Sequence, residues 1–114
     1  MTGFLTTHVL DTARGRPAAG LRIELHALDG DASRHVTTAV TNADGRTDGP
    51  ILPGDAFAHG TYELTFHAGD YLRALGADDA FLDRVPIRFA MTQDAHYHVP
   101  LLLSPFGYST YRGS

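Results

Sequence analysis

The stretch "AHYHVPLLLS", residues 95–104, decides the fold of the chain. In a β-strand, successive side chains point to opposite faces of the sheet. One alternating set is wholly apolar and is expected to face a hydrophobic core: Tyr97, Val99, Leu101 and Leu103. The other set mixes histidines with apolar residues on the outer face: His96, His98, Pro100 and Leu102. This pattern is typical of a strand in a two-layer packing of sheets.

Similar short segments recur along the chain and are separated by turn residues about every ten residues, as in a sandwich or barrel of short strands. The expected strands cover residues 4–11, 21–28, 34–42, 61–69, 85–91, 95–104 and 106–112, with a short extended segment at 51–54. The spacing becomes helical only at 70–77, with Asp70 as the expected N-cap and Gly76 as the end. We therefore expect an all-β, two-sheet sandwich of about eight strands with one short helix, forming a single domain over residues 1–114.

Composition excludes several classes of function. The 114 residues include no cysteine, so neither a disulfide framework nor a thiolate metal site is indicated. The net charge is −4 and the nine cations are scattered arginines, so we expect no nucleic-acid partner. No apolar run reaches the ~20 residues of a membrane span. No signal peptide follows Met1, and we expect a soluble, cytoplasmic protein without a membrane partner.

The outer faces of the predicted strands carry the chemically interesting residues. In the first strand, Leu5 and Val9 are expected to point inward. Thr6, His8 and Leu10 are expected to point outward. An outer face that mixes histidines with leucine and proline suggests a surface covered by a second subunit. Three interpretations of the histidines remain open: hydrogen bonds at the surface, metal binding by His96 and His98, or acid–base chemistry with a neutral imidazole.

Three segments, in this order, resemble one family. They are "HVLDTARGRPAAGLRIEL" (8–25), "NADGRTDGPIL" (42–52) and "HYHVPLLLSPFGYSTYRGS" (96–114). They are similar to segments of 5-hydroxyisourate hydrolases, the transthyretin-related proteins of urate degradation in purine metabolism. The resemblance covers essentially the whole chain. The terminal "YRGS" is its most specific mark, because transthyretin lacks that ending.

The resemblance implies a transthyretin-like (prealbumin-like) sandwich assembled as a homotetramer, a dimer of dimers, with active sites in the channel between dimers. It implies hydrolysis of 5-hydroxyisourate between N1 and C6, a cyclic amide-like bond. The product would be 2-oxo-4-hydroxy-4-carboxy-5-ureidoimidazoline. No metal and no organic cofactor are expected.

The family's functional residues match individual positions of this sequence. The matched residues expected to be catalytic are His8, Arg46, His98, Tyr111 and Ser114. Those expected to bind substrate are His8, Arg46, Arg112, Gly113 and Tyr111. The remaining histidines fall outside the family pattern and are interpreted as ordinary surface residues: His26, His35, His59, His67 and His96.

Each matched residue suits a role. The two histidines would hold and deprotonate a water, and the sequence does not say which is the base. Arg46 and Arg112 would clamp the flat substrate, because a guanidinium donates hydrogen bonds in a planar fork. Tyr111 would donate its hydroxyl or cover the ring. Ser114 would offer a hydroxyl and an α-carboxylate, and Gly113 would permit a backbone bend.

Two alternatives compete with the hydrolase. The first is a non-catalytic, transthyretin-like binding module that holds a small hydrophobic ligand in the same channel. The polar set of histidines and arginines argues against it, because a carrier pocket should be mostly apolar. The second is a metal-binding protein that uses His96 and His98.

Overall fold

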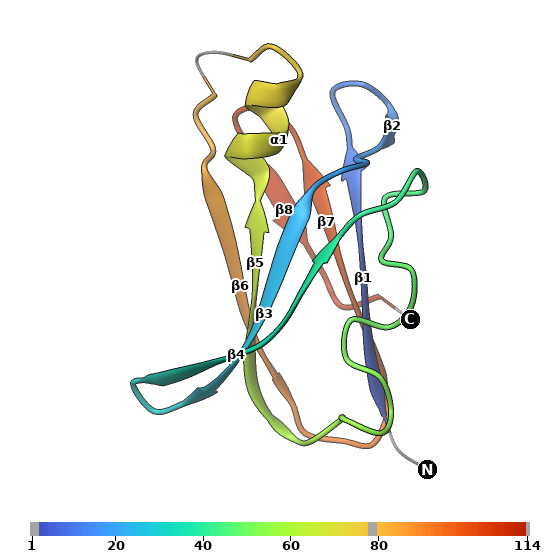
Figure 1. Ribbon diagram of the computed structural model, residues 1–114, viewed down its shortest axis with the longest axis vertical. Coiled ribbons are helices and arrows are strands. Elements are labelled where there is room, and N and C mark those ends of the chain that lie inside the picture. Colours follow the sequence, from blue (N-terminus) through green and yellow to red (C-terminus); the bar gives the residue numbers. More distant parts are fainter. Residues whose placement is uncertain (1–2, 78–79, 114) are drawn as a thin grey trace.

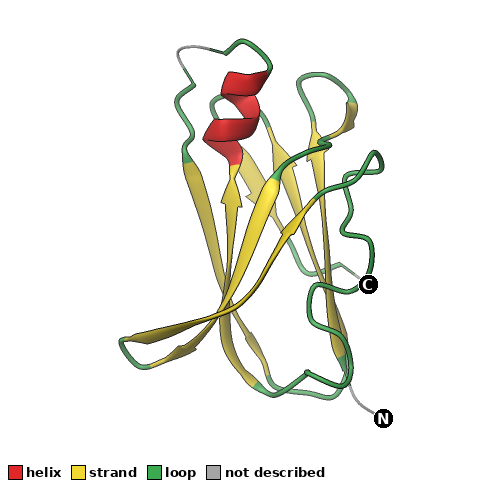
Figure 2. Cartoon of the chain, viewed as in Figure 1, coloured by secondary structure: helices red, strands yellow, loops and turns green. Residues whose placement is uncertain are grey.

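The computed structural model describes residues 3–77 and 80–113, which form two four-stranded sheets and one helix (Figure 1). The first, here called the β1 sheet, has the order β2 (Arg16–Pro17), β1 (Phe4–Asp11), β7 (His96–Leu103) and β8 (Tyr108–Thr110). The second, the β3 sheet, has the order β4 (Ala32–Val40), β3 (Arg22–Asp29), β5 (Gly60–His67) and β6 (Arg84–Met91). Figure 2 shows how strands dominate the chain. The predicted all-β sandwich with one short helix is confirmed.

The inner faces of the two sheets enclose the hydrophobic core. The predicted apolar row of β7 is buried, with exposed fractions of 0% for Leu101 and Leu103. From the β3 sheet, Leu64 and Phe66 of β5 are likewise fully buried. Full burial of such a side chain stabilises the fold by about 1.5–3 kcal/mol. The alternation predicted for these strands is therefore confirmed.

Strands β1 and β7 pair in parallel, and this pair positions the outer face. Thr7, on the inner side between Leu5 and Val9, is only 1% exposed. Its hydroxyl donates a hydrogen bond to the carbonyl oxygen of Val99, at 2.7 Å. A buried hydroxyl that is satisfied in this way fixes β1 against β7.

The helix begins earlier than predicted. Helix α1 spans Ala68–Ala74, so Asp70 lies in its first turn and is not the N-cap. The N-cap is His67, which makes no side-chain capping hydrogen bond. The backbone N–H of Gly69 instead donates to the carbonyl oxygen of Asp83, at 2.7 Å, so a neighbouring segment satisfies this end of the helix. Gly76, with a φ of +94°, follows the helix as predicted.

Three further strand predictions need correction. Residues 51–54 form no strand and make only the isolated bridge between Leu52 and Leu5. A short strand, β2, forms at Arg16–Pro17, where a turn was expected. Strand β8 is shorter than predicted: its register places Tyr111 opposite Pro100, which has no N–H to donate to the ladder.

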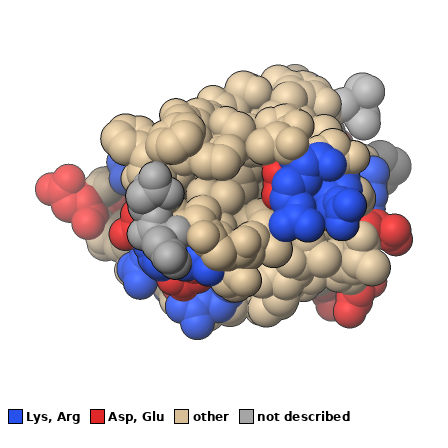
Figure 3. All heavy atoms as spheres, turned by 90° about the horizontal axis from the view of Figure 1, so that it is seen from above, with Lys and Arg blue, Asp and Glu red and all other residues tan. Residues whose placement is uncertain are grey.

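The surface agrees with the scattered charges of the sequence. On the face in Figure 3, basic side chains lie in separate groups with acidic side chains among them. Among the described residues, no helix combines the length and the apolar character needed to cross a bilayer.

Candidate active site

The register of β1 and β7 gathers four polar side chains on the outer face of the β1 sheet. Thr6 lies beside His98 in this register, and Phe4 lies beside His96. His8 is two residues beyond Thr6 and therefore points to the same side. Thr6, His8 and His98 are half-buried, whereas His96 is exposed. Parallel pairing thus brings both ends of the chain into one cluster.

His8 and His98 are in direct contact. Nδ1 of His8 lies 2.9 Å from Nε2 of His98, within hydrogen-bonding distance. The two rings are stacked, with centroids 5.0 Å apart and an interplanar angle of 15°. One ring nitrogen must donate and the other accept, so the tautomers of the two histidines are linked. Two neutral imidazoles arranged in this way can accept, hold and pass on a proton.

Arg46 reaches the pair from the loop that follows β4. The side-chain oxygen of Asn42 accepts hydrogen bonds from the backbone N–H groups of Asp44 and Arg46, which closes a tight turn. Gly45 has a φ of +74°, and its carbonyl oxygen accepts the N–H of Val9 at 2.8 Å. A Cβ at Gly45 would lie 2.4 Å from the carbonyl oxygen of Val9, so only glycine permits this approach. Arg46 consequently pairs with His8 through their backbones, in an isolated antiparallel β-bridge.

The C-terminal segment closes the other side of the site. Beyond β8 the chain continues along β7, and the N–H of Gly113 donates to the carbonyl oxygen of His98 at 2.7 Å. A Cβ at Gly113 would lie 2.7 Å from Cδ2 of His98. Its φ lies outside the left-handed region, so no left-handed backbone conformation requires glycine here. Glycine is needed here for close approach to the imidazole.

The order across the sheet is therefore loop, β1, β7 and C-terminal segment, carrying Arg46, His8, His98 and Gly113 in turn. Figure 1 shows the loop after β4 and the C-terminus on the same side of the molecule. Four segments that are distant in the sequence supply one site. Three of these residues, Arg46, His8 and His98, have side chains that were predicted to act on the substrate.

Tyr111 and Arg112 separate onto different faces. Tyr111 is 56% exposed, and the register from Thr110 to Gly113 places it opposite Pro100, on the face of the histidines. The same register places Arg112 opposite Val99, on the inner face. Its guanidinium carbon lies 4.3 Å from the ring centroid of Tyr97, a cation–π contact. The structure does not bring the Arg112 side chain to the histidines, and Ser114 lies outside the described residues.

The surroundings of both histidines favour their neutral forms. Desolvation by burial lowers the pKa of His8 below 6.5, and the positive charge of Arg46 lowers it further. Desolvation also lowers the pKa of His98, with further contributions from His8, Arg46 and His96. A neutral imidazole is the form that can accept a proton from water. The pair is thus prepared to act as a base at neutral pH.

The other histidines differ from the sequence-based interpretation in two cases. His67 is buried, at 2% exposed, and its Nε2 lies 2.5 Å from a carboxylate oxygen of Glu24. His96 is exposed as expected, but it contacts Thr6 and so belongs to the cluster. Its i, i+2 spacing from His98 was the signal that could have identified it. Over residues 3–77 and 80–113, no three histidine or acidic side chains are grouped so as to hold a metal ion.

The fold and the site define a transthyretin-type β-sandwich with paired histidines and an arginine on its outer face. The chain belongs to the HIUase/Transthyretin family, whose model matches residues 5–113.

Relatives agree over the full length. The chain is 63% identical to 5-hydroxyisourate hydrolase 2 of Rhizobium meliloti, covering 99% of this chain and 98% of the relative. The structure of Klebsiella pneumoniae 5-hydroxyisourate hydrolase is similar, with a TM-score of 0.84 and 34% identity over 97% of this chain and 99% of that one. A crystal structure of (S)-allantoin synthase matches with a TM-score of 0.89 and 49% identity. That match covers 98% of this chain but only 44% of that longer chain.

Proposed function

We propose that this protein is a 5-hydroxyisourate hydrolase, which opens its substrate between N1 and C6 in urate degradation. The observation that carries the proposal is the hydrogen bond between His8 and His98, with Arg46 beside it. Hydrolysis of an amide-like bond needs a water made nucleophilic, a donor for the developing oxyanion and a clamp for the substrate. The site contains a residue type suited to each need.

We assign His8 as the residue that meets the water. Both ring nitrogens of His98 have partners, Thr6 at Nδ1 and His8 at Nε2. Nε2 of His8 makes no hydrogen bond with any described side chain, so it is the nitrogen available to water. In this arrangement His8 takes the proton through Nε2. Nδ1–H of His8 then donates a hydrogen bond to Nε2 of His98, which stabilises the imidazolium that forms on His8, as the third member of a catalytic triad does.

Arg46 is suited to hold the substrate and its developing oxyanion. Its guanidinium carries a fixed positive charge and can donate two parallel hydrogen bonds to adjacent oxygen and nitrogen atoms. The same charge lowers the pKa of both histidines, so Arg46 also helps to keep the base neutral. Tyr111 and Gly113 complete the proposed wall on the C-terminal side. Roles for Arg112 and Ser114 in substrate binding remain predictions.

A direct assay tests the function. 5-Hydroxyisourate is generated from urate in situ, and its ultraviolet absorbance is followed with and without the protein. We expect the protein to accelerate the decay strongly. An uncatalysed rate in the presence of folded protein would contradict the proposal and would favour the carrier alternative.

The dependence on pH should report the histidine pair. Since a base must be neutral to accept a proton, and burial and Arg46 lower both pKa values, kcat/KM should stay high as pH falls to 6.5 and decline only below that value. The decline should be steep, because protonation of either histidine removes the active form. Initial rates are measured at each pH after subtraction of the uncatalysed decay. A flat profile down to about pH 5, well below the imidazole reference value, would argue against a histidine base.

We keep the homotetramer and the cytoplasmic location as parts of the proposal. Apolar side chains next to the site support a subunit contact, because Leu10 and Leu102 lie side by side on the same outer face. A partner across this face would enclose the site and exclude water from it.

A further inference from the structure

The hydrogen bonds of the site continue beyond His98. Oγ1 of Thr6 lies 2.7 Å from Nδ1 of His98 and 2.6 Å from Nε2 of His96. Together with the contact between His8 and His98, these bonds form a continuous chain of four side chains, in the order His8, His98, Thr6 and His96. The parallel register of β1 and β7 makes this possible, because it places Thr6 beside His98 and between the two other histidines.

The Thr6 hydroxyl links the protonation of its two neighbours. A hydroxyl has one proton, so when it bonds two imidazole nitrogens it donates to one and accepts from the other. If Thr6 donates to His96, then His98 carries its proton on Nδ1 and accepts from Nδ1–H of His8. Nε2 of His8 is then bare and can act as a base.

The same four side chains can also form all of their hydrogen bonds with every donor and acceptor exchanged. There, Nε2–H of His96 donates to Thr6, Thr6 donates to Nδ1 of His98, and Nε2–H of His98 donates to Nδ1 of His8. Nε2 of His8 then carries a proton. The first arrangement of protons becomes the second when one proton enters at Nε2 of His8 and another leaves from Nδ1 of His96. No ring gains or loses net charge.

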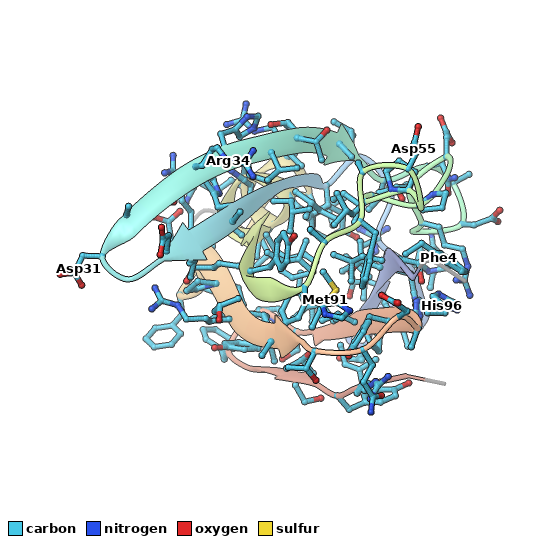
Figure 4. All side chains as sticks on the ribbon, turned by 90° about the horizontal axis from the view of Figure 1, so that it is seen from below. Phe4, Asp31, Arg34, Asp55, Met91 and His96 are labelled. Carbon is cyan, nitrogen blue, oxygen red and sulfur yellow. The ribbon has the colours of Figure 1, made fainter. Side chains whose placement is uncertain are left out.

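The two ends of this chain lie in different surroundings. His8 and His98 are half-buried, whereas His96 is exposed. Phe4 stacks on His96, with ring centroids 4.1 Å apart and planes at 11°, and holds the imidazole in place. Figure 4 shows Phe4 and His96 side by side at the edge of the molecule. The chain therefore leads from the reacting atoms to solvent.

The reaction releases a proton that needs such a route. Water adds to C6 and the bond from C6 to N1 breaks, so the carbonyl group becomes a carboxyl group, and N1 gains one proton and becomes the terminal NH₂ of a ureido group. A ureido nitrogen does not take up a further proton at neutral pH, whereas a carboxyl group with a pKa of about 4 is ionised. Each neutral substrate hydrolysed therefore yields one proton, and a site closed by a second subunit would retain it.

We propose that Thr6 and His96 are the exit path for this proton, which passes from His8 through His98 and Thr6 to His96 and then to solvent. This inference rests on the proposed hydrolase function. It assigns Thr6 and His96 to proton transfer, although neither meets the substrate. The first arrangement of protons is restored when the Thr6 hydroxyl and the imidazole N–H groups reorient between turnovers, a step that carries no proton back to His8.

Thr6 supplies the first test. Thr6→Val has nearly the same shape and keeps a β-branched side chain in the strand, but it lacks the hydroxyl. We expect kcat to fall by about 10-fold with KM little changed, because proton transfer is impaired and substrate contacts are not. Thr6→Ser restores the hydroxyl and should recover most of kcat. Equal loss in both variants, or wild-type kcat in Thr6→Val, would overturn the proposal.

His96 supplies the second test. In His96→Ala, kcat should be low in dilute buffer and should rise as imidazole or phosphate is added, because a small buffer can accept the proton in place of the side chain. Wild-type kcat and that of the control His59→Ala should not depend on buffer concentration at constant ionic strength. His59 is exposed and pairs with Asp94, outside the cluster. Wild-type kcat in His96→Ala, or a loss that buffer does not rescue, would overturn the proposal.

The tests separate the two levels of inference. A wild-type protein that fails to accelerate the decay of 5-hydroxyisourate refutes the hydrolase. An active wild-type protein whose Thr6→Val and His96→Ala variants behave normally refutes only the exit path.

Discussion

Replacement of His98 by alanine is expected to lower kcat by about 100-fold or more, because a positioned acid or base commonly contributes that factor or more. In the structure, His98 accepts or donates at both ring nitrogens, to His8 at 2.9 Å and to Thr6 at 2.7 Å. Alanine removes both contacts. His8 then loses the partner that orients its ring and stabilises its protonated form, so the base is both misplaced and weakened.

The fold should survive this change. His98 is half-buried on the outer face, and the backbone contacts of β7 with β1 and with Gly113 do not involve the imidazole. A suitable control is His35→Ala, which removes an exposed histidine from β4 in the other sheet, bonded only to Thr38 among the described side chains. We expect wild-type kcat in the control. Near-wild-type kcat in His98→Ala, measured with the same in situ assay, would remove His98 from the mechanism.

Strand alternation was sufficient to predict which face each histidine occupies. The row from Tyr97 to Leu103 is buried as predicted, and His8 and His98 point outward from their strands. Alternation carries no information on which strands pair, or in which direction. The parallel pairing of β1 with β7 joins residues about 90 positions apart, and only that register brings Thr6 between His96 and His98. The i, i+2 spacing could place His96 on the face of His98, but its hydrogen-bonded link to His98 through Thr6 could not be predicted from the residues alone.

Loops and chain ends were harder to predict, because their positions depend on contacts with distant backbone. Arg46 lies in a turn that a sequence argument alone would leave in solvent. Its place beside His8 depends on the close approach of Gly45 to Val9. The early start of α1 has a similar origin, since the carbonyl oxygen of Asp83 satisfies the N–H of Gly69 from another segment. The end of β8 was the one boundary that could have been predicted, from the missing N–H of Pro100.

The family resemblance supplied what the residues could not. It matched His8, Arg46, His98 and Gly113 together, and the structure places all four side by side across one sheet. It also matched Arg112, whose guanidinium lies instead over Tyr97, on the inner face. A match by motif identifies positions, whereas the orientation of each side chain follows from local register. Neighbouring residues of "YRGS" therefore serve different faces of the sheet.

Gly113 provides the second large effect. Gly113→Ala is expected to lower kcat by about 10- to 100-fold, because displacement of a catalytic group by as little as 1 Å can cost a factor of that order. The new Cβ would lie 2.7 Å from Cδ2 and 3.3 Å from Cγ of His98, well inside contact distance. The imidazole cannot turn away freely, since Thr6 and His8 hold both of its nitrogens. Either the ring or the C-terminal segment must move.

A matched control lies in the same segment. Gly107→Ala also adds one methyl group, but its nearest neighbour beyond the adjoining residues would be Oγ of Ser104, at an ordinary distance of 3.8 Å. Both variants should unfold at temperatures close to that of the wild type, and only Gly113→Ala should lose kcat. If the displaced group is His98, the loss should appear in kcat more than in KM, and the acid limb of the pH profile should shift as the contact between His98 and His8 changes. Equal kcat in the two variants would mean that the close approach of Gly113 to His98 has no part in catalysis.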